Sequence, residues 1–204
     1  MNNYLDQVRG YNIRQAHPIP KKTALLVIDM QRRFREVAEQ VLGNVILLID
    51  ACIASEGKLF FTRQGNQQAT AAGGMLTTWW GNITEYGSWD WEFLDALPST
   101  DRGTIIDKTR YDAFFGTELD DQLKKLEVND IVICGVTTNC CCETTAREAF
   151  VRDYRVFFVA DATATTNEEL HLASLKNLAY GFAYLVNTKD IAEILLGKNG
   201  RVIR

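Results

Sequence analysis

Three adjacent cysteines follow a short apolar segment and are the residues of this chain best suited to nucleophilic chemistry. The apolar run at 131–136 predicts a buried strand, and Asn139, Cys140, Cys141 and Cys142 then open a stretch with helical spacing. Free backbone N–H groups and the positive end of the helix dipole favour a thiolate in the first turn of a helix. The stretch therefore predicts an enzyme with a cysteine nucleophile.

Helical spacing distinguishes the three thiols. Cys142, Ala146 and Ala149 fall on one apolar face, so Cys142 is expected in the core. With Asn139 as the N-cap, Cys141 occupies the second helical position, where its N–H is free to donate to a developing oxyanion. Cys141 is the predicted nucleophile. The spacing fits as well with all three being small buried hydrophobic residues.

Two charged residues at expected strand ends complement such a thiol. In an open parallel sheet a site forms at the carboxyl ends of the strands, where the strand order reverses. Asp29 follows the apolar run 24–28, and Lys108 follows a strand expected over 104–107. They offer a base for the thiol proton and a cation beside the thiolate. The alternative is that Asp29 caps the next helix and that Lys108 is solvated.

Apolar runs alternate with helical patterns from Thr23 onward. Strands are expected at 24–28, 58–62, 104–107, 131–136, 155–160 and 183–186, and helices at 44–56, 117–126 and from the capping-box spacing at 166–169 to Gly181. The glycine-rich segment 64–82 is expected to be a functional loop. This order predicts an α/β fold: one domain with a doubly wound, mostly parallel, six-stranded sheet and helices on both faces. Residues 1–22 are expected to form an N-terminal arm that packs on the domain 23–204 or on another subunit.

Composition indicates the kind of partner and the compartment. The net charge is −4 without a long block of like charge, which predicts a small-molecule substrate, with no nucleic acid and no membrane as partners. Three of the five cysteines are contiguous and cannot pair with each other in a helix, so no disulfide framework is expected. The first residues lack the basic start and apolar core of a signal peptide, and a cytoplasmic location is expected.

Three separated motifs resemble those of the isochorismatase-like cysteine hydrolases. They are LVIDMQ at 26–31, KTRYDAF at 108–114, and GVTTNCC followed by ETTAR within 135–147. The resemblance covers about residues 23–194. The family includes nicotinamidases, N-carbamoylsarcosine amidases, ureidoacrylate and biuret hydrolases, and isochorismatases. The cysteine motif and the stretch 161–184 look most like plant-type nicotinamidases.

The resemblance implies a catalytic triad of Asp29, Lys108 and Cys141. It also implies a cis peptide bond between Val136 and Thr137, which would aim the Thr137 N–H, together with that of Cys141, at the substrate oxygen. The implied reaction cleaves a C–N bond of a small amide or of a carbamoyl or ureido compound through a thioester. Family members are usually homo-oligomers, dimers or larger. We expect the following residues to bind substrate, with plain packing as the alternative for the aromatic ones: Gln31, Gln64, Trp79, Trp80, Tyr111 and Phe115.

The chain departs from the family at the position of a metal site. Metal-dependent nicotinamidases place an Asp and two His after the second strand, whereas this chain has Gln64, Asn66, Gln67 and Gln68 there. Its two histidines are His17, in the arm, and His171, for which a structural role is expected, so we expect no metal and no cofactor. Nicotinamide is therefore an alternative substrate. The rival functions are vinyl-ether hydrolysis of the isochorismatase type and a catalytically silent binding or oligomerisation module.

Overall fold

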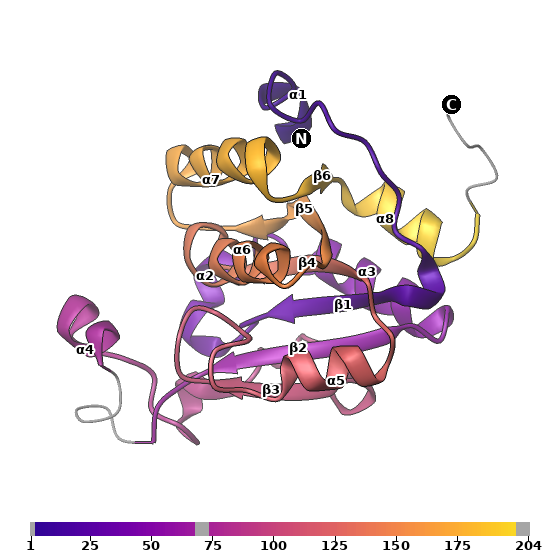
Figure 1. Ribbon diagram of the computed structural model, residues 1–204. Coiled ribbons are helices and arrows are strands. Elements are labelled where there is room, and N and C mark those ends of the chain that lie inside the picture. Colours follow the sequence, from indigo (N-terminus) through magenta and orange to yellow (C-terminus); the bar gives the residue numbers. More distant parts are fainter. Residues whose placement is uncertain (1–2, 68–73, 199–204) are drawn as a thin grey trace.

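A six-stranded sheet forms the middle layer of the computed structural model, which describes residues 3–67 and 74–198 (Figure 1). Its strand order is β3-β2-β1-β4-β5-β6, and every neighbouring pair is parallel. The strands are β1 (Thr23–Ile28), β2 (Lys58–Gln64), β3 (Thr104–Lys108), β4 (Asp130–Val136), β5 (Arg155–Ala164) and β6 (Tyr184–Val186). The predicted α/β fold with a doubly wound sheet is confirmed.

Helices cover both faces of the sheet. One face carries α5 (Leu119–Lys125), α6 (Glu143–Val151) and α7 (Glu168–Gly181), and the other carries α2 (Arg35–Ala38), α3 (Leu42–Ala54) and α8 (Thr188–Leu195). Two short helices are α1 (Tyr4–Gln7) and α4 (Met75–Trp80), and a π-helical turn spans Thr138–Cys142. Single 3-10 turns are Pro20–Lys22, Arg32–Phe34, Trp89–Trp91 and Thr100–Arg102.

The uninterrupted apolar sequence of β1 follows from burial on both faces. Successive side chains of a strand point to opposite faces. Leu26 and Ile28 therefore join the core beneath α5, α6 and α7, while Leu25 and Val27 join the core beneath α3 and α8. Such double burial is usual for parallel strands.

Several elements differ from the prediction, among them the short helices α1 and α2, which were not expected. The segment 64–82 contains the helix α4, and α8 was not predicted at all. The strand β5, expected over 155–160, continues to Ala164, so Asp161 lies within the strand and not after it. The Asp161 carboxylate accepts hydrogen bonds from the N–H and the hydroxyl of Thr188, at 2.7 and 2.8 Å, and so anchors the start of α8.

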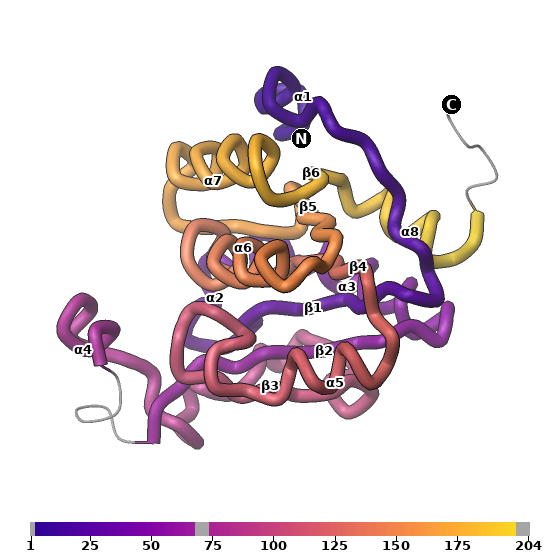
Figure 2. Tube along the Cα trace, viewed as in Figure 1, coloured from indigo at the N-terminus to yellow at the C-terminus, as the bar shows by residue number. Residues whose placement is uncertain are grey.

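The N-terminal arm packs on its own domain. Val8 is fully buried in the core with α7, and the Asn12 side chain bonds the main chain of Leu185 in β6. Arg14 donates to the carbonyl of Tyr180 at 3.0 Å. Figure 2 shows the arm running from α1, beside α7, along the outside of the molecule to β1.

Within the parts of the chain that the structure describes, no single helix is long and apolar enough to cross a membrane. Residues 32–38 and 42–54 pass such a test only as a pair, with a bend of 103° between them.

Candidate active site

The sheet order places two loops side by side at its centre. The order reverses between the neighbouring strands β1 and β4, which is where ligands bind in open parallel sheets. Asp29 directly follows β1, and the cysteine turn follows β4. Lys108 is the last residue of β3. The structure brings these three predicted residues together.

Lys108 and Asp29 form a buried ion pair. The Lys108 Nζ lies 2.8 Å from Asp29 Oδ2, and neither side chain is exposed to solvent. Nζ also donates to the carbonyls of Arg110 and Tyr111, at 2.9 and 3.1 Å. The Cys141 side chain is a further hydrogen-bonding neighbour of this ammonium, which has three donors. The cation is therefore held in one position.

A threonine fixes the aspartate. The Thr62 hydroxyl donates to Asp29 Oδ1 at 2.5 Å and accepts the Asp29 N–H at 3.1 Å. These bonds hold Asp29 at a φ of 47°, a left-handed conformation in which Asp is one of the more tolerant residues. Thr62 was a candidate by its position at a strand end, but it was not among the residues predicted to be catalytic or to bind substrate. Its place near the end of β2, the neighbour of β1, was the available signal.

The cysteine turn begins differently from the prediction. The bond between Val136 and Thr137 is cis, and the chain then enters the π-helical turn, whose N-cap is Thr137. The Thr137 carbonyl accepts the N–H groups of Cys140 and Cys142, both at 3.2 Å, and leaves the Cys141 N–H without this acceptor. The predicted N-cap, Asn139, is wrong because the helix already starts at Thr138.

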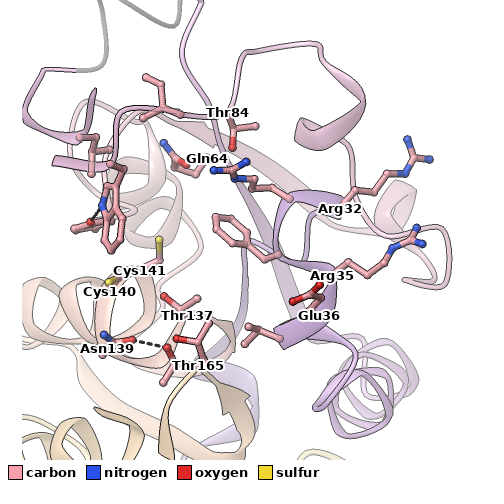
Figure 3. A pocket seen from close by; sticks show the side chains of 18 of the residues that line it. Arg32, Arg35, Glu36, Gln64, Thr84, Thr137, Asn139, Cys140, Cys141 and Thr165 are labelled. Atoms are coloured by element: carbon pink, nitrogen blue, oxygen red, sulfur yellow. Dashed lines mark hydrogen bonds between the residues drawn. The ribbon is translucent and has the colours of Figure 1, made fainter. Parts of the chain in front are cut away.

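The other side chains of this turn differ in their contacts and in their burial. The Asn139 side chain accepts a hydrogen bond from the Thr165 hydroxyl at 2.7 Å, drawn as a dashed line in Figure 3. Cys142 is fully buried in the core, as predicted. Cys140 is half-buried, and Cys141 is 4% exposed.

Burial dominates the ionisation of the site. Burial and then the Asp29 carboxylate raise the pKa of the Cys141 thiol well above its ordinary value, against the lowering effect of Lys108. Burial alone would lower the pKa of Lys108, but the negative charges of Asp29 and Cys141 outweigh it, and the net shift is upward. Burial and Asp29 therefore work against the thiolate that the sequence predicts, whereas Lys108 works in its favour.

A cavity of about 610 Å³ opens onto the cysteine turn. Thr137, Cys140 and Cys141 line it, and Asp29 and Lys108 lie beneath the surface that they form. Three of the residues expected to bind substrate, Gln64, Trp80 and Tyr111, also line it. Figure 3 shows Gln64, Thr137, Cys140 and Cys141 around this cavity.

Comparison with known proteins identifies the family. The model of the isochorismatase domain matches residues 23–190. The chain belongs to the isochorismatase family. Nicotinamidase 3 of Arabidopsis thaliana is 45% identical over 192 residues, which cover 93% of this chain and 96% of that protein. Enterobactin synthase component B of Escherichia coli K12 is 30% identical over 204 residues, covering 92% and 72% of the two chains. The crystal structure of a cysteine hydrolase from Pseudomonas syringae pv. phaseolicola matches with a TM-score of 0.85 and 27% identity, covering 90% of this chain and 97% of that one.

Three residues expected to bind substrate lie elsewhere in this isochorismatase-family structure. Trp79 and Phe115 line a neighbouring pocket of about 500 Å³. Trp79 and Trp80 face different pockets because successive residues of a helix point about 100° apart. Gln31 is fully buried, and its amide bonds the main chain of Gln64 and Trp91 at 2.7 to 3.1 Å. Gln31 therefore holds the cavity wall in place and has no free group for a substrate.

The turn after β1 supplies pocket residues that sequence reasoning missed. Arg32, Arg33 and Phe34 line the cavity, and the run of basic residues directly after a strand end was the available signal. Arg32 pairs with Asp95 and lies 5.0 Å from the ring of Trp89. Figure 3 shows the Arg32 side chain pointing away from the cavity, as that of Arg35 does.

The site also differs from a metal centre in its donor set. Residues 3–67 and 74–198 contain no group of three or more His, Cys, Asp or Glu side chains that could hold a metal ion. At the end of β2 and just after it, the chain presents the amides of Gln64 and Asn66, and neutral amides are poor ligands for zinc compared with imidazole or thiolate. The expected Gln68 lies outside the described residues.

Proposed function

We propose that this isochorismatase-family hydrolase is a cysteine amidohydrolase that cleaves a C–N bond of a small amide or of a carbamoyl or ureido compound. The observation that carries this proposal is the position of Cys141, which lines the cavity and interacts with both members of the buried pair of Asp29 and Lys108. Such an arrangement supplies a nucleophile, a base for its proton and a fixed cation in one place.

The proposed reaction begins with proton transfer. Asp29 takes the Cys141 proton as the sulfur attacks the substrate carbonyl, so the thiolate exists only while the new bond forms. The N–H groups of Thr137 and Cys141 stabilise the tetrahedral oxyanion. Asp29 then protonates the leaving ammonia or amine, and a water molecule hydrolyses the thioester. Lys108 offsets the negative charge that moves between Cys141 and Asp29.

Nicotinamide is the second candidate substrate. It is favoured by the 45% identity to Nicotinamidase 3 and by the flat aromatic side chains of Phe34, Trp80 and Tyr111 along the cavity. Vinyl-ether hydrolysis of the isochorismatase type, which dispenses with a nucleophilic cysteine, is disfavoured by the position of Cys141. The same position disfavours a catalytically silent module.

Ammonia release from the purified protein tests these proposals. The panel comprises nicotinamide, small aliphatic amides, N-carbamoyl compounds and ureides, with Cys141→Ala as the control. We expect release from at least one compound and none from the variant. Release from nicotinamide alone would select the second candidate. No release from any compound, or equal release by Cys141→Ala, would contradict a cysteine amidohydrolase.

We also infer a cytoplasmic homo-oligomer, a dimer or larger. The five free cysteines support a reducing compartment. The exposed side chains of Met75, Trp79 and Phe115 support assembly, since such apolar groups are often covered by a partner. Analytical ultracentrifugation at micromolar concentration should show a dimer or a larger assembly. Sedimentation as a monomer would contradict this proposal.

A further inference from the structure

We propose that His171 is a positioning residue for the catalytic turn, and that the N-terminal arm holds His171 in place through Tyr4. This inference rests on the proposed function, because it concerns the geometry of the same turn. It assigns a role to residues that lie outside the cavity and, for the arm, outside the matched family domain at 23–190.

The first contact joins His171 to the turn. The Nδ1 atom of His171 lies 2.8 Å from the Thr138 hydroxyl, and both residues are buried, at 3% and 0% exposed. Thr138 begins the π-helical turn and directly follows Thr137, the proposed oxyanion donor. A hydrogen bond at this point restrains the backbone that presents both proposed donors.

The ring is suited to a fixed contact. Burial lowers the pKa of His171 to about 4, with a smaller opposing effect from the Ala160 backbone. The imidazole is therefore neutral near pH 7, and a neutral ring has one nitrogen that accepts a hydrogen bond. We assign Nδ1 as the acceptor of the Thr138 hydroxyl proton.

The second contact joins His171 to the arm. The rings of Tyr4 and His171 lie 4.5 Å apart between centroids, at an interplanar angle of 61°, in an edge-to-face arrangement. Tyr4 belongs to α1, which Figure 1 shows beside α7, the helix that carries His171. Val8 anchors the same segment in the core. The arm thus covers one side of the histidine, and Thr138 lies against another.

These contacts predict an effect on catalysis without an effect on binding. His171 is not among the residues that line the cavity, so its loss leaves substrate contacts in place. A misplacement of 1 Å in an active site costs about 100-fold in rate. Loss of one hydrogen bond shifts the turn by less, and we expect a decrease of roughly tenfold in kcat with little change in KM.

Four variants test the positioning role. His171→Leu and Thr138→Val remove the hydrogen bond from either side, and His171→Asn retains an acceptor near Nδ1. Tyr4→Ala removes the contact from the arm. His17→Leu is the matched control, because His17 is exposed and belongs to the arm. We expect lower kcat for His171→Leu, Thr138→Val and Tyr4→Ala, recovery in His171→Asn, and no change in His17→Leu.

The double variant His171→Leu with Thr138→Val should be no slower than either single variant, since both remove the same bond. Unchanged kcat in His171→Leu and Thr138→Val, or a loss in His171→Asn equal to that in His171→Leu, would overturn the proposal. If His171→Leu does not fold, as judged by urea unfolding, Thr138→Val and Tyr4→Ala carry the test.

A second measurement keeps this inference separate from the proposed function. The rate of Cys141 alkylation by iodoacetamide at pH 9 reports the geometry of the turn without any substrate. We expect it to change at least threefold in His171→Leu and to recover in His171→Asn. If the wild type is inactive but alkylation changes as expected, only the proposed function is contradicted. If all variants are alkylated at the same rate, the positioning role is contradicted.

Discussion

The Cys141 thiol faces a carboxylate and an ammonium in a site with almost no contact with water. Asp29 and Lys108 are not exposed, and the three groups act on one another at short range. A helix terminus and a nearby cation favour a thiolate. Here burial and the Asp29 charge outweigh both, because a thiolate would be a second anion without water around it. In the proposed reaction, this cost is met by proton transfer from Cys141 to Asp29 as the sulfur attacks the substrate.

Replacement of Asp29 by Asn should therefore change turnover and alkylation in opposite directions. Turnover should fall by at least about 100-fold, the low end for general acid/base catalysis, because the base is lost. Alkylation of Cys141 near pH 8 should become faster, because removal of the carboxylate lowers the pKa of the thiol while Lys108 remains. Mass spectrometry of the labelled peptide, with Cys141→Ala as the blank, measures the second effect. Slower alkylation would contradict the assigned electrostatics.

The same ion pair predicts a loss of stability in Lys108→Met. Removal of one partner leaves an uncompensated buried charge, which costs about 3–5 kcal/mol. Lys124→Met is the matched control, because the Lys124 side chain is 66% exposed and pairs with Asp120 at 2.8 Å. An exposed pair contributes about 0.2–1 kcal/mol. Urea unfolding of both variants gives the comparison, and equal losses would show that burial of Lys108 is not decisive.

At the scale of elements, the sequence predicted those helices and strands whose position depends on the local pattern of residues. The apolar run of β1 and the start of α7 were recognised. The capping-box spacing at 166–169 makes Thr166 the N-cap, whereas in the structure Asn167 is the N-cap and accepts the N–H groups of Glu169 and Leu170. The start of the cysteine helix was not recognised, because it depends on how the chain leaves β4 and enters the turn. The helix α8 was missed although it carries a local signal, since Asn187 is its N-cap and accepts the Asp190 N–H at 2.9 Å. A contact from another strand adds to this signal, because Asp161 of β5 fixes Thr188.

Gly135 illustrates such a tertiary constraint and gives a third prediction. It has a φ of 111°, and a Cβ there would lie 2.1 Å from the Ile28 carbonyl oxygen. Gly135→Ala forces β1 and β4 apart beside Asp29, and we expect a loss of about 3 kcal/mol or more, at or above the upper end for overpacking. Gly43→Ala is the control, because nothing lies within 4 Å of its Cβ position in α3. It should stabilise the protein by about 0.5–1 kcal/mol. Similar unfolding midpoints for both variants would contradict this account.

At the scale of the molecule, the alternation of strands and helices predicted the fold class but not the position of every site residue. Strand order places Asp29 and Cys141 directly after the neighbouring strands β1 and β4, and Lys108 is the last residue of the edge strand β3. Trp79 and Phe115 were expected in the same cavity, yet of the two tryptophans in 74–82 only Trp80 lines it. The arm shows the same limit of prediction from sequence, since nothing in its residues indicates that Tyr4 contacts His171.

The distribution of histidines over the whole molecule leads to the last prediction, that catalysis needs no metal ion. A catalytic zinc takes three protein ligands from His, Cys or carboxylate side chains. The chain has two histidines: His17 is exposed in the arm, and His171 is buried with its Nδ1 on Thr138. Asp29 is engaged by Lys108 and Thr62, and the described residues offer no cluster of three ligands around it. Prolonged treatment with a chelator should leave turnover of the best substrate unchanged, and elemental analysis should find far less than one transition metal per chain. Stoichiometric zinc, with activity lost to the chelator and restored by zinc, would contradict this prediction and favour nicotinamide as the substrate.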